Sequence, residues 1–148
     1  MRVSIGSDHA GLGLKRALEE HLTAAGHDVS DVGTHDSTPV DYPDLAAAVG
    51  AAVSAGEADR GVLVCGSGIG VAIAANKIPG IRAANVSDPE MAKMSRLHND
   101  ANVVTMGGRY LSEDSAREIV DMFLRTPFEG GRHQRRVDKI TALEHGRT

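Results

Sequence analysis

Cys65 is the only cysteine in the chain, and the glycine-rich turn Gly66-Ser67-Gly68-Ile69-Gly70 follows it directly. The cysteine ends an apolar run typical of a buried strand, and a helical pattern follows the turn. Unpaired N–H groups at such a strand-to-helix turn favour an anion, whether a thiolate, a phosphate or the oxyanion of an enediolate. The pattern predicts a thiolate base beside an anion-binding loop, with a buried structural cysteine as the alternative.

The turn differs from three better-known loops. Position 71 is Val, so the turn lacks the Gly or Ala that completes the dinucleotide-binding fingerprint, and it also lacks the Lys of a P-loop. A cysteine phosphatase loop needs an Arg shortly after the thiol, but Val71-Ala72-Ile73 follow here. We therefore expect a small-anion site of another kind.

Another segment carries polar side chains suited to a sugar. Asp8 and His9 lie in the loop after the first predicted strand, and a carboxylate there can accept hydrogen bonds from hydroxyl groups. The alternative for both residues is to brace their own loop.

His98 ends a predicted helix, where the helix dipole favours a protonated ring and so a proton donor near neutral pH. It shares a helix face with Met91 and Met94, so a core histidine is the alternative. Arg132 and Arg136 are four residues apart on the last predicted helix and share a face on which two guanidinium groups can grip a phosphate.

Short apolar runs alternate with helical patterns along the chain. Strands are predicted over residues 2–5, 29–32, 61–65, 81–86 and 102–106, with helices between them. A capping box at Ser87-Asp88-Pro89-Glu90 and an N-cap at Ser112 start two of the helices, and a last helix runs from about Gly131 to about His145.

This alternation predicts an α/β fold, a single doubly wound, Rossmann-like α/β/α sandwich with a five-stranded parallel sheet and an additional C-terminal helix. We expect one domain over residues 1–148. With the common strand order 2-1-3-4-5, ligands bind at the carboxyl ends of strands 1 and 3. Asp8-His9 and the Cys65 turn both arrive at that position.

The helices of this fold run antiparallel to its strands, so His98 and Asn99 should lie at the end of the sheet opposite Cys65. One chain cannot easily join them in one site. A two-fold dimer, in which each subunit's His98 reaches the other's Cys65, is the simplest arrangement that does. A tetramer made of two such dimers is also compatible with the sequence.

Composition narrows the class of protein. The 148 residues are 41% hydrophobic and 3% aromatic, with a net charge of −4. Residues 125–148 hold six Lys or Arg against three acids, which suits a small anion, whereas the overall charge argues against a nucleic-acid or membrane surface. We expect a cytoplasmic protein without a membrane span or an internal disulfide.

Several segments, taken together, resemble type B ribose-5-phosphate isomerase and the wider family that includes allose-6-phosphate and galactose-6-phosphate isomerases. They cover nearly the whole chain in order: Ser7-Asp8-His9-Ala10-Gly11, Gly33-Thr34, Asp41-Tyr42-Pro43, the Cys65 turn, Ile73-Ala74-Ala75-Asn76-Lys77, His98-Asn99-Asp100-Ala101-Asn102 and Glu129-Gly130-Gly131-Arg132-His133.

The resemblance implies an aldose–ketose isomerase that needs no metal or cofactor and acts through a cis-enediolate. The family's proton-transferring thiol falls on Cys65, its ring-opening donor on His98 and its anion-hole loop on Gly66 to Gly70. Its substrate contacts fall on Asp8, His9 and Asn99, and its phosphate-binding arginines on Arg109, Arg132 and Arg136, with His133 as an extra contact. Some members replace the thiol with a carboxylate just after the glycine loop, but Val71 stands there in this chain.

Ribose 5-phosphate is the expected substrate. A six-carbon sugar phosphate such as allose 6-phosphate is the alternative, because one methylene-sized difference is worth only about 1–3 kcal/mol of discrimination. A non-catalytic sensor of sugar phosphates or nucleotides is a rival from another class. A response-regulator receiver would carry a phospho-acceptor Asp where Cys65 stands.

Overall fold

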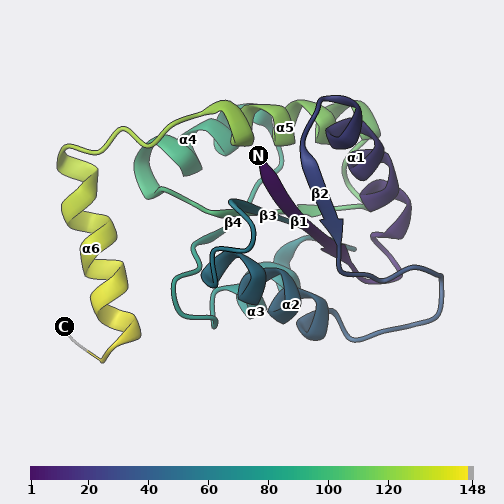
Figure 1. Ribbon diagram of the computed structural model, residues 1–148, viewed down its shortest axis with the longest axis horizontal. Helices are drawn as coiled ribbons and strands as arrows, with labels where there is room; N and C mark the ends of the chain where they lie inside the picture. Colours follow the sequence, from purple (N-terminus) through teal and green to yellow (C-terminus); the bar gives the residue numbers. More distant parts are fainter. Residues whose placement is uncertain (147–148) are drawn as a thin grey trace.

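A five-stranded parallel sheet forms the centre of the computed structural model, which describes residues 1–146 (Figure 1). Its strands are β1 (Arg2–Ser7), β2 (Asp28–Asp31), β3 (Arg60–Cys65), β4 (Ala83–Asn85) and β5 (Val103–Gly107). The inner strands β1, β3 and β5 are buried along almost their whole length, as expected for strands covered on both faces. The predicted fold class is confirmed.

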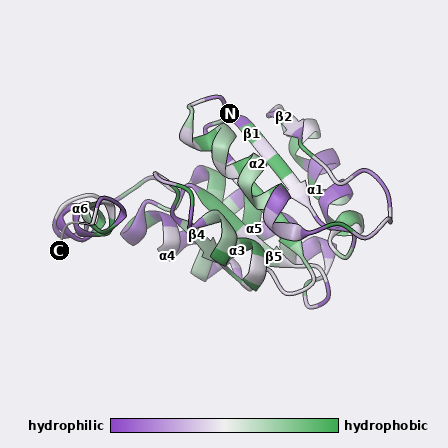
Figure 2. Cartoon of the chain, turned by 90° about the horizontal axis from the view of Figure 1, so that it is seen from below, coloured by the Kyte–Doolittle hydropathy of each residue, from purple (hydrophilic) through white to green (hydrophobic). Residues whose placement is uncertain are grey.

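Helices cover both faces of the sheet. The helices α1 (Leu12–Ala24), α4 (Pro89–Asn99) and α5 (Glu113–Arg125) pack on one face, and α2 (Tyr42–Ser54) and α3 (Ile69–Ala75) pack on the other (Figure 1). Most apolar residues of these helices face the sheet and most polar residues face outward (Figure 2), with Lys15 of α1 and Arg96 of α4 as buried exceptions. Among residues 1–146, no helix combines the length and the apolar character that crossing a bilayer requires.

The strand order is β2-β1-β3-β5-β4, so the predicted order 2-1-3-4-5 is wrong for the last two strands. Cys65 of β3 is paired in register with Gly107 of β5, and the short strand β4 lies at the sheet edge. After β3 and α3, the chain skips the position beside β3 that β5 will fill and forms β4 one position further out. It then returns through α4 on the face that also carries α1. The expected crevice between β1 and β3 is unaffected, because those two strands are neighbours.

The predicted helix starts are partly confirmed. Ser112 caps α5, since its hydroxyl accepts a hydrogen bond from the Ser115 N–H at 3.1 Å. The start of α4 differs from the predicted capping box by one position. Its cap is Asp88, whose carboxylate accepts from the Met91 N–H at 2.8 Å, because Pro89 fits the first helical turn directly after it.

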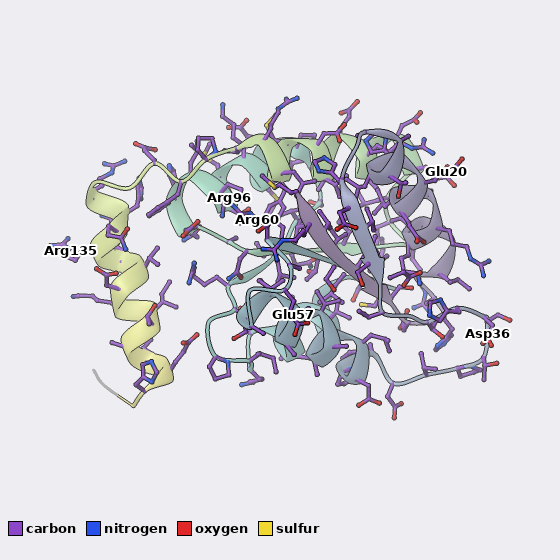
Figure 3. All side chains as sticks on the ribbon, in the orientation of Figure 1. Glu20, Asp36, Glu57, Arg60, Arg96 and Arg135 are labelled. Atoms are coloured by element: carbon purple, nitrogen blue, oxygen red, sulfur yellow. The ribbon has the colours of Figure 1, made fainter. Side chains whose placement is uncertain are left out.

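The last helix, α6 (Arg132–Glu144), stands beside the sandwich and belongs to neither layer (Figure 1). Only His133 and Val137 of this helix are buried. Arg135 points away from the rest of the molecule, whereas Arg96 of α4 points inward (Figure 3). The Arg96 guanidinium donates to the Thr126 carbonyl at 3.1 Å and pairs with Asp100 at 2.8 Å. This arginine therefore ties the end of α4 to the segment that leads into α6.

A buried ion pair between Lys15 and Asp31 fixes the loop that follows β2 and lies beside the end of β1. The side chain of Lys15 is 0% exposed, and its ammonium contacts both carboxylate oxygens of Asp31 at 2.7 Å and donates to the Thr34 carbonyl. Thr34 and Gly33 in turn share backbone hydrogen bonds with Ser7 at the end of β1. The pair thus holds residues 33–40 beside the loop that carries Asp8 and His9.

Replacing Lys15 by Met should lower the free energy of unfolding by about 3–5 kcal/mol, because the Asp31 carboxylate would stay buried without its partner. Arg2→Met is the matched control. It breaks an exposed pair with Asp59, whose side chains are 51% and 39% exposed, and should cost less than about 1 kcal/mol. Urea unfolding of both variants at pH 7 measures the difference, and equal losses would contradict the structural role of the buried pair.

Candidate active site

A cavity of about 430 Å³ opens at the carboxyl ends of β1 and β3. Eight of the predicted site residues line it: Asp8, His9, Cys65, Gly66, Ser67, Ile69, Gly70 and Arg109. The other lining residues are Ala10, Tyr42 and Ile73. The crevice predicted from the strand connections therefore contains the loops that carry the reactive side chains.

Cys65 lies at the floor of this cavity, 4% exposed. The N–H of Gly68 donates to its Sγ at 3.1 Å. A donor aimed at sulfur stabilises the thiolate more than the thiol, so it favours the form that acts as a base. In the same turn the Ile69 N–H donates to the Ser67 hydroxyl at 3.2 Å, so two N–H groups of the turn already have partners within it.

Gly68 can hold this position only as glycine. Its φ is +79°, and a Cβ would lie 2.4 Å from Asn85 Oδ1 and 2.7 Å from the carbonyl carbon of Met106. The Thr105 hydroxyl donates to the Gly68 carbonyl at 2.8 Å and fixes the other side of the same residue. Contacts with β5 therefore fix the backbone of the turn at Gly68.

Arg109 places a positive charge at the same cavity. A Cβ on Gly66 would lie 3.1 Å from the Arg109 guanidinium carbon, so the glycine lets this group lie flat against the loop backbone. The Arg109 N–H donates to the Gly66 carbonyl at 3.1 Å and fixes where the side chain starts. A guanidinium beside free N–H groups suits a phosphate or an oxyanion.

Asp8 and His9 have different surroundings. Asp8 is 7% exposed and one of its oxygens accepts from the Gly11 N–H at 3.0 Å, so it braces its loop, as the alternative interpretation holds, while it also lines the cavity. His9 is exposed, and its Nδ1 accepts from the Val40 N–H at 3.2 Å. In the neutral ring that bond leaves Nε2 as an N–H donor for a ligand.

The remaining predicted residues form a second cluster, where the end of α4 meets the start of α6. His98 stacks on His133 with ring centroids 4.2 Å apart and planes inclined by 12°. Its side chain is 40% exposed, so the core-histidine alternative is wrong. Asn99, Arg132 and Arg136 are exposed in the same region, and none of the cluster lines the Cys65 cavity. One chain does not bring Cys65 and His98 together.

The His98–His133 pair sits among charged groups. The carboxylate of Glu129 lies 3.9 Å from Nε2 of each ring. Burial, followed by the charges of His98, Arg132 and Arg136, lowers the pKa of His133, and Glu129 opposes this change. Two imidazoles and a carboxylate are potential metal ligands, but Arg132 Nε lies 3.5 Å from His133 Nε2 and repels a cation. These residues therefore suit an anion better than a metal ion.

Comparison with known proteins agrees with this geometry. The family model described as Ribose/Galactose Isomerase matches residues 3–140. The chain belongs to this family. It is 47% identical to ribose-5-phosphate isomerase B of Escherichia coli (strain K12) over 146 residues, which cover 99% of this chain and 98% of the relative.

Two further relatives from the family bear on substrate and fold. The chain is 38% identical over 148 residues to D-erythrulose-4-phosphate isomerase of Pectobacterium atrosepticum, covering 98% of this chain and 96% of the relative. The structure of Clostridium thermocellum ribose-5-phosphate isomerase B superposes with a TM-score of 0.98 at 50% identity and covers 99% of each chain.

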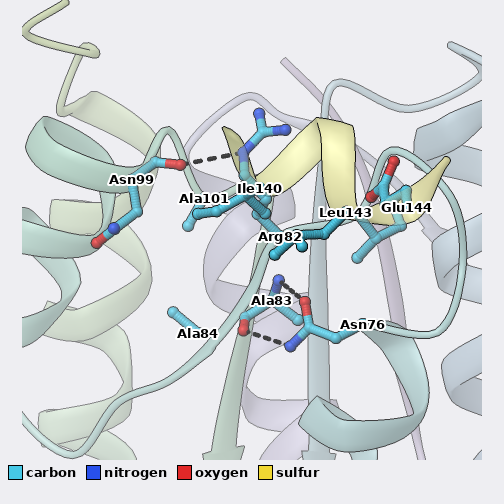
Figure 4. A pocket seen from close by; sticks show the side chains of 10 residues that line it. Asn76, Arg82, Ala83, Ala84, Asn99, Ala101, Ile140, Leu143 and Glu144 are labelled. Carbon is cyan, nitrogen blue, oxygen red and sulfur yellow. Dashed lines mark hydrogen bonds between the residues drawn. The ribbon is translucent and has the colours of Figure 1, made fainter. Parts of the chain in front are cut away.

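A larger cavity of about 560 Å³ lies between α6 and the edge of the sheet (Figure 4). Asn99 lines this cavity, and the Arg82 Nε donates to the Asn99 carbonyl at 3.0 Å. Ile140 and Leu143 of α6 form part of its wall. It contains no nucleophilic side chain, so its chemistry does not match that of an isomerase site.

Sequence reasoning gave no role to Tyr42 and Glu129, although both lie in segments that carried the family resemblance. Tyr42 packs over Gly70, where a Cβ would lie 2.6 Å from its ring, and it walls the cavity. Glu129 is four residues before His133, a spacing that brings the two side chains together where α6 begins. The four-residue spacing between Glu129 and His133 was the sequence signal that could have pointed to Glu129.

Proposed function

We propose that this protein interconverts ribose 5-phosphate and ribulose 5-phosphate through a cis-enediolate. The observation that carries the proposal is the buried Cys65 thiol, whose sulfur accepts a hydrogen bond from the Gly68 N–H at the floor of a cavity that Asp8, His9 and Arg109 also line. The names of relatives that match nearly the whole chain support the choice of sugar. The proposal covers residues 1–148 as one isomerase domain that uses no metal and no cofactor.

In the proposed mechanism, the Cys65 thiolate takes the proton from C2 of the open-chain aldose. The electrons move onto the C1 oxygen and form the enediolate. The thiol then returns the proton to C1, while the proton of the C2 hydroxyl passes to the C1 oxygen and leaves the C2 carbonyl of the ketose. The N–H groups of the turn from Gly66 to Gly70 stabilise the oxyanion, because charge develops there only as the proton leaves. Asp8, His9 and Asn99 hold the hydroxyl groups.

The sugar must be opened and anchored before that step. His98 is proposed to protonate the ring oxygen, and Arg109, Arg132 and Arg136 to bind the phosphate. Arg132 and Arg136 share one face of α6, so a phosphate there can be gripped by two guanidinium groups. Anchoring the phosphate keeps C1 and C2 of the sugar within reach of the Cys65 thiol.

These parts meet only if two copies of the chain form the site. Cys65 lies at the carboxyl end of the sheet, and His98 lies where α4 returns to the start of β5, so we propose a two-fold homodimer. Apolar side chains left exposed around the cavity support it, since Ile69 is 55% and Ile73 58% exposed. On α6, Leu143 is 63% exposed and offers a complementary surface.

The proposal also includes a reducing, cytoplasmic setting. A single thiol that must ionise to act would be lost by oxidation outside such a compartment. Cys65 has no second cysteine to pair with in the chain, which supports this setting.

Cys65→Ala should lower kcat for ribose 5-phosphate by about 10²–10⁴-fold, because a positioned base contributes that much to proton abstraction. The free energy of unfolding should change little, since a small buried side chain is only shortened. Coupled assays and urea unfolding measure the two quantities. Turnover within a few-fold of wild type would remove Cys65 from the role of base.

Mixing two defective variants tests the shared site. Cys65→Ala and the double variant His98→Asn/Arg132→Ala should each be nearly inactive alone. After joint refolding, half of the dimers are mixed and hold one intact site of two, so activity should recover to about a quarter of wild type. No recovery in a mixture shown by light scattering to be dimeric would place the whole site within one chain.

A further inference from the structure

The mechanism above uses His98 as a proton donor and leaves His133 and Glu129 without a role. The two imidazoles are stacked with centroids 4.2 Å apart, so protonating one disfavours protonating the other. Which ring carries the proton therefore depends on what surrounds each of them.

The surroundings of His133 favour its neutral form. Its side chain is 5% exposed, and the Arg132 Nε donates toward its Nε2 at 3.5 Å, a position that a protonated ring would fill with its own hydrogen. Burial is the largest cause that lowers the pKa of His133, and the positive charges of Arg132 and Arg136 act in the same direction. These groups disfavour a proton on His133.

Glu129 supplies the opposite charge. Its N–H donates to the Leu97 carbonyl at 3.1 Å, which fixes its backbone against the last turn of α4. From there its carboxylate reaches 3.9 Å from His98 Nε2. The carboxylate lies equally far from His133 Nε2, so it favours a proton on the pair as a whole, and the burial of His133 makes the more exposed His98 ring the better site for that proton.

Other charged groups near the end of α4 are already paired. Asp100 is 2.8 Å from Arg96 and 3.3 Å from Arg82, and Arg96 also donates to the Thr126 carbonyl. The groups of α6 and its connecting segment that face the histidine pair are Glu129, Arg132 and Arg136.

We propose that Glu129 and His133 are positioning residues that make His98 the one protonated imidazole of the pair. His133 does so by stacking as a neutral ring, and Glu129 by balancing the charge of the imidazolium. The inference deepens the proposed ring-opening role of His98 and rests on the proposed function for its catalytic consequence. Its electrostatic part concerns the protein alone.

Glu129→Gln tests the electrostatic part without any substrate. The imidazole C–H resonances are followed in an NMR titration between pH 5 and 8.5. The protonation midpoint of His98 should be lower in Glu129→Gln than in the wild-type protein by roughly half a pH unit, because the compensating charge is gone. His133 should stay neutral down to a lower pH than His98 in both proteins. The matched control is Asp138→Asn, an exposed carboxylate of α6 that pairs with Gln134, and it should leave both titrations unchanged.

Kinetics test the link to ring opening. Erythrose 4-phosphate cannot close into a furanose ring, because its 4-oxygen carries the phosphate, so it needs no ring-opening acid. At pH 7.5, Glu129→Gln should lower kcat/KM for ribose 5-phosphate several-fold and leave that for erythrose 4-phosphate within twofold. Glu129→Asp should restore part of the loss.

Each outcome separates the inference from the proposed function. An unmoved His98 midpoint in Glu129→Gln, an equal shift in Asp138→Asn, or a His133 ring that protonates first would overturn the inference. Equal losses for the two sugars would also overturn it. If the wild-type protein turns over neither sugar, while Glu129→Gln still shows the expected His98 shift, the proposed function is refuted and the electrostatic arrangement stands.

Discussion

The direction of the strands governs the rest of this molecule. In a parallel sheet the carboxyl ends of all strands lie at one end of the sheet, and the helices that return the chain finish at the opposite end. Cys65 ends β3 beside Gly107 of β5, whereas His98 ends the helix that leads back to the start of β5. A thiol and an imidazole fixed in this way cannot meet within one chain. The proposed chemistry therefore depends on a second copy, and α6, which lies outside both layers, carries the phosphate-binding arginines proposed for the neighbouring site.

At the end of the sheet that carries Cys65, the close approach of backbone segments sets the geometry around the thiol. A Cβ on Gly107 would lie 2.7 Å from the Ser67 carbonyl oxygen, so β5 and the turn can touch only through glycine. The Thr105 hydroxyl holds the Gly68 carbonyl from the same strand. Because β5 and not β4 is the neighbour of β3, these contacts lie directly under the turn and aim the Gly68 N–H at the thiol. The strand order is thus part of how the site is built.

Alternation of apolar runs and helical patterns was sufficient to predict the fold class and the crevice that contains Asp8, His9 and the Cys65 turn. The order of β4 and β5 was missed because a default order was assumed. A signal existed, since Val103-Val104-Thr105-Met106 is a continuous run of larger, mostly apolar residues, whereas Arg82-Ala83-Ala84-Asn85 has only two alanines between polar residues, as suits a short edge strand. The surroundings of His98 could not be predicted in full. Its stacking on His133 depends on the path of the segment before α6, which Arg96 fixes through the Thr126 carbonyl.

Isomerisation of ribose 5-phosphate in D₂O, followed by NMR with a chelator present, tests the central claim most directly. The proton that the Cys65 thiolate takes from C2 can exchange with solvent before it returns, so repeated turnovers should place deuterium at C1 of ribulose 5-phosphate. Deuterium at that carbon is the result that a Cys65 proton shuttle through an enediolate predicts. Ribulose 5-phosphate that forms without any deuterium at C1, or no product at all, would contradict it.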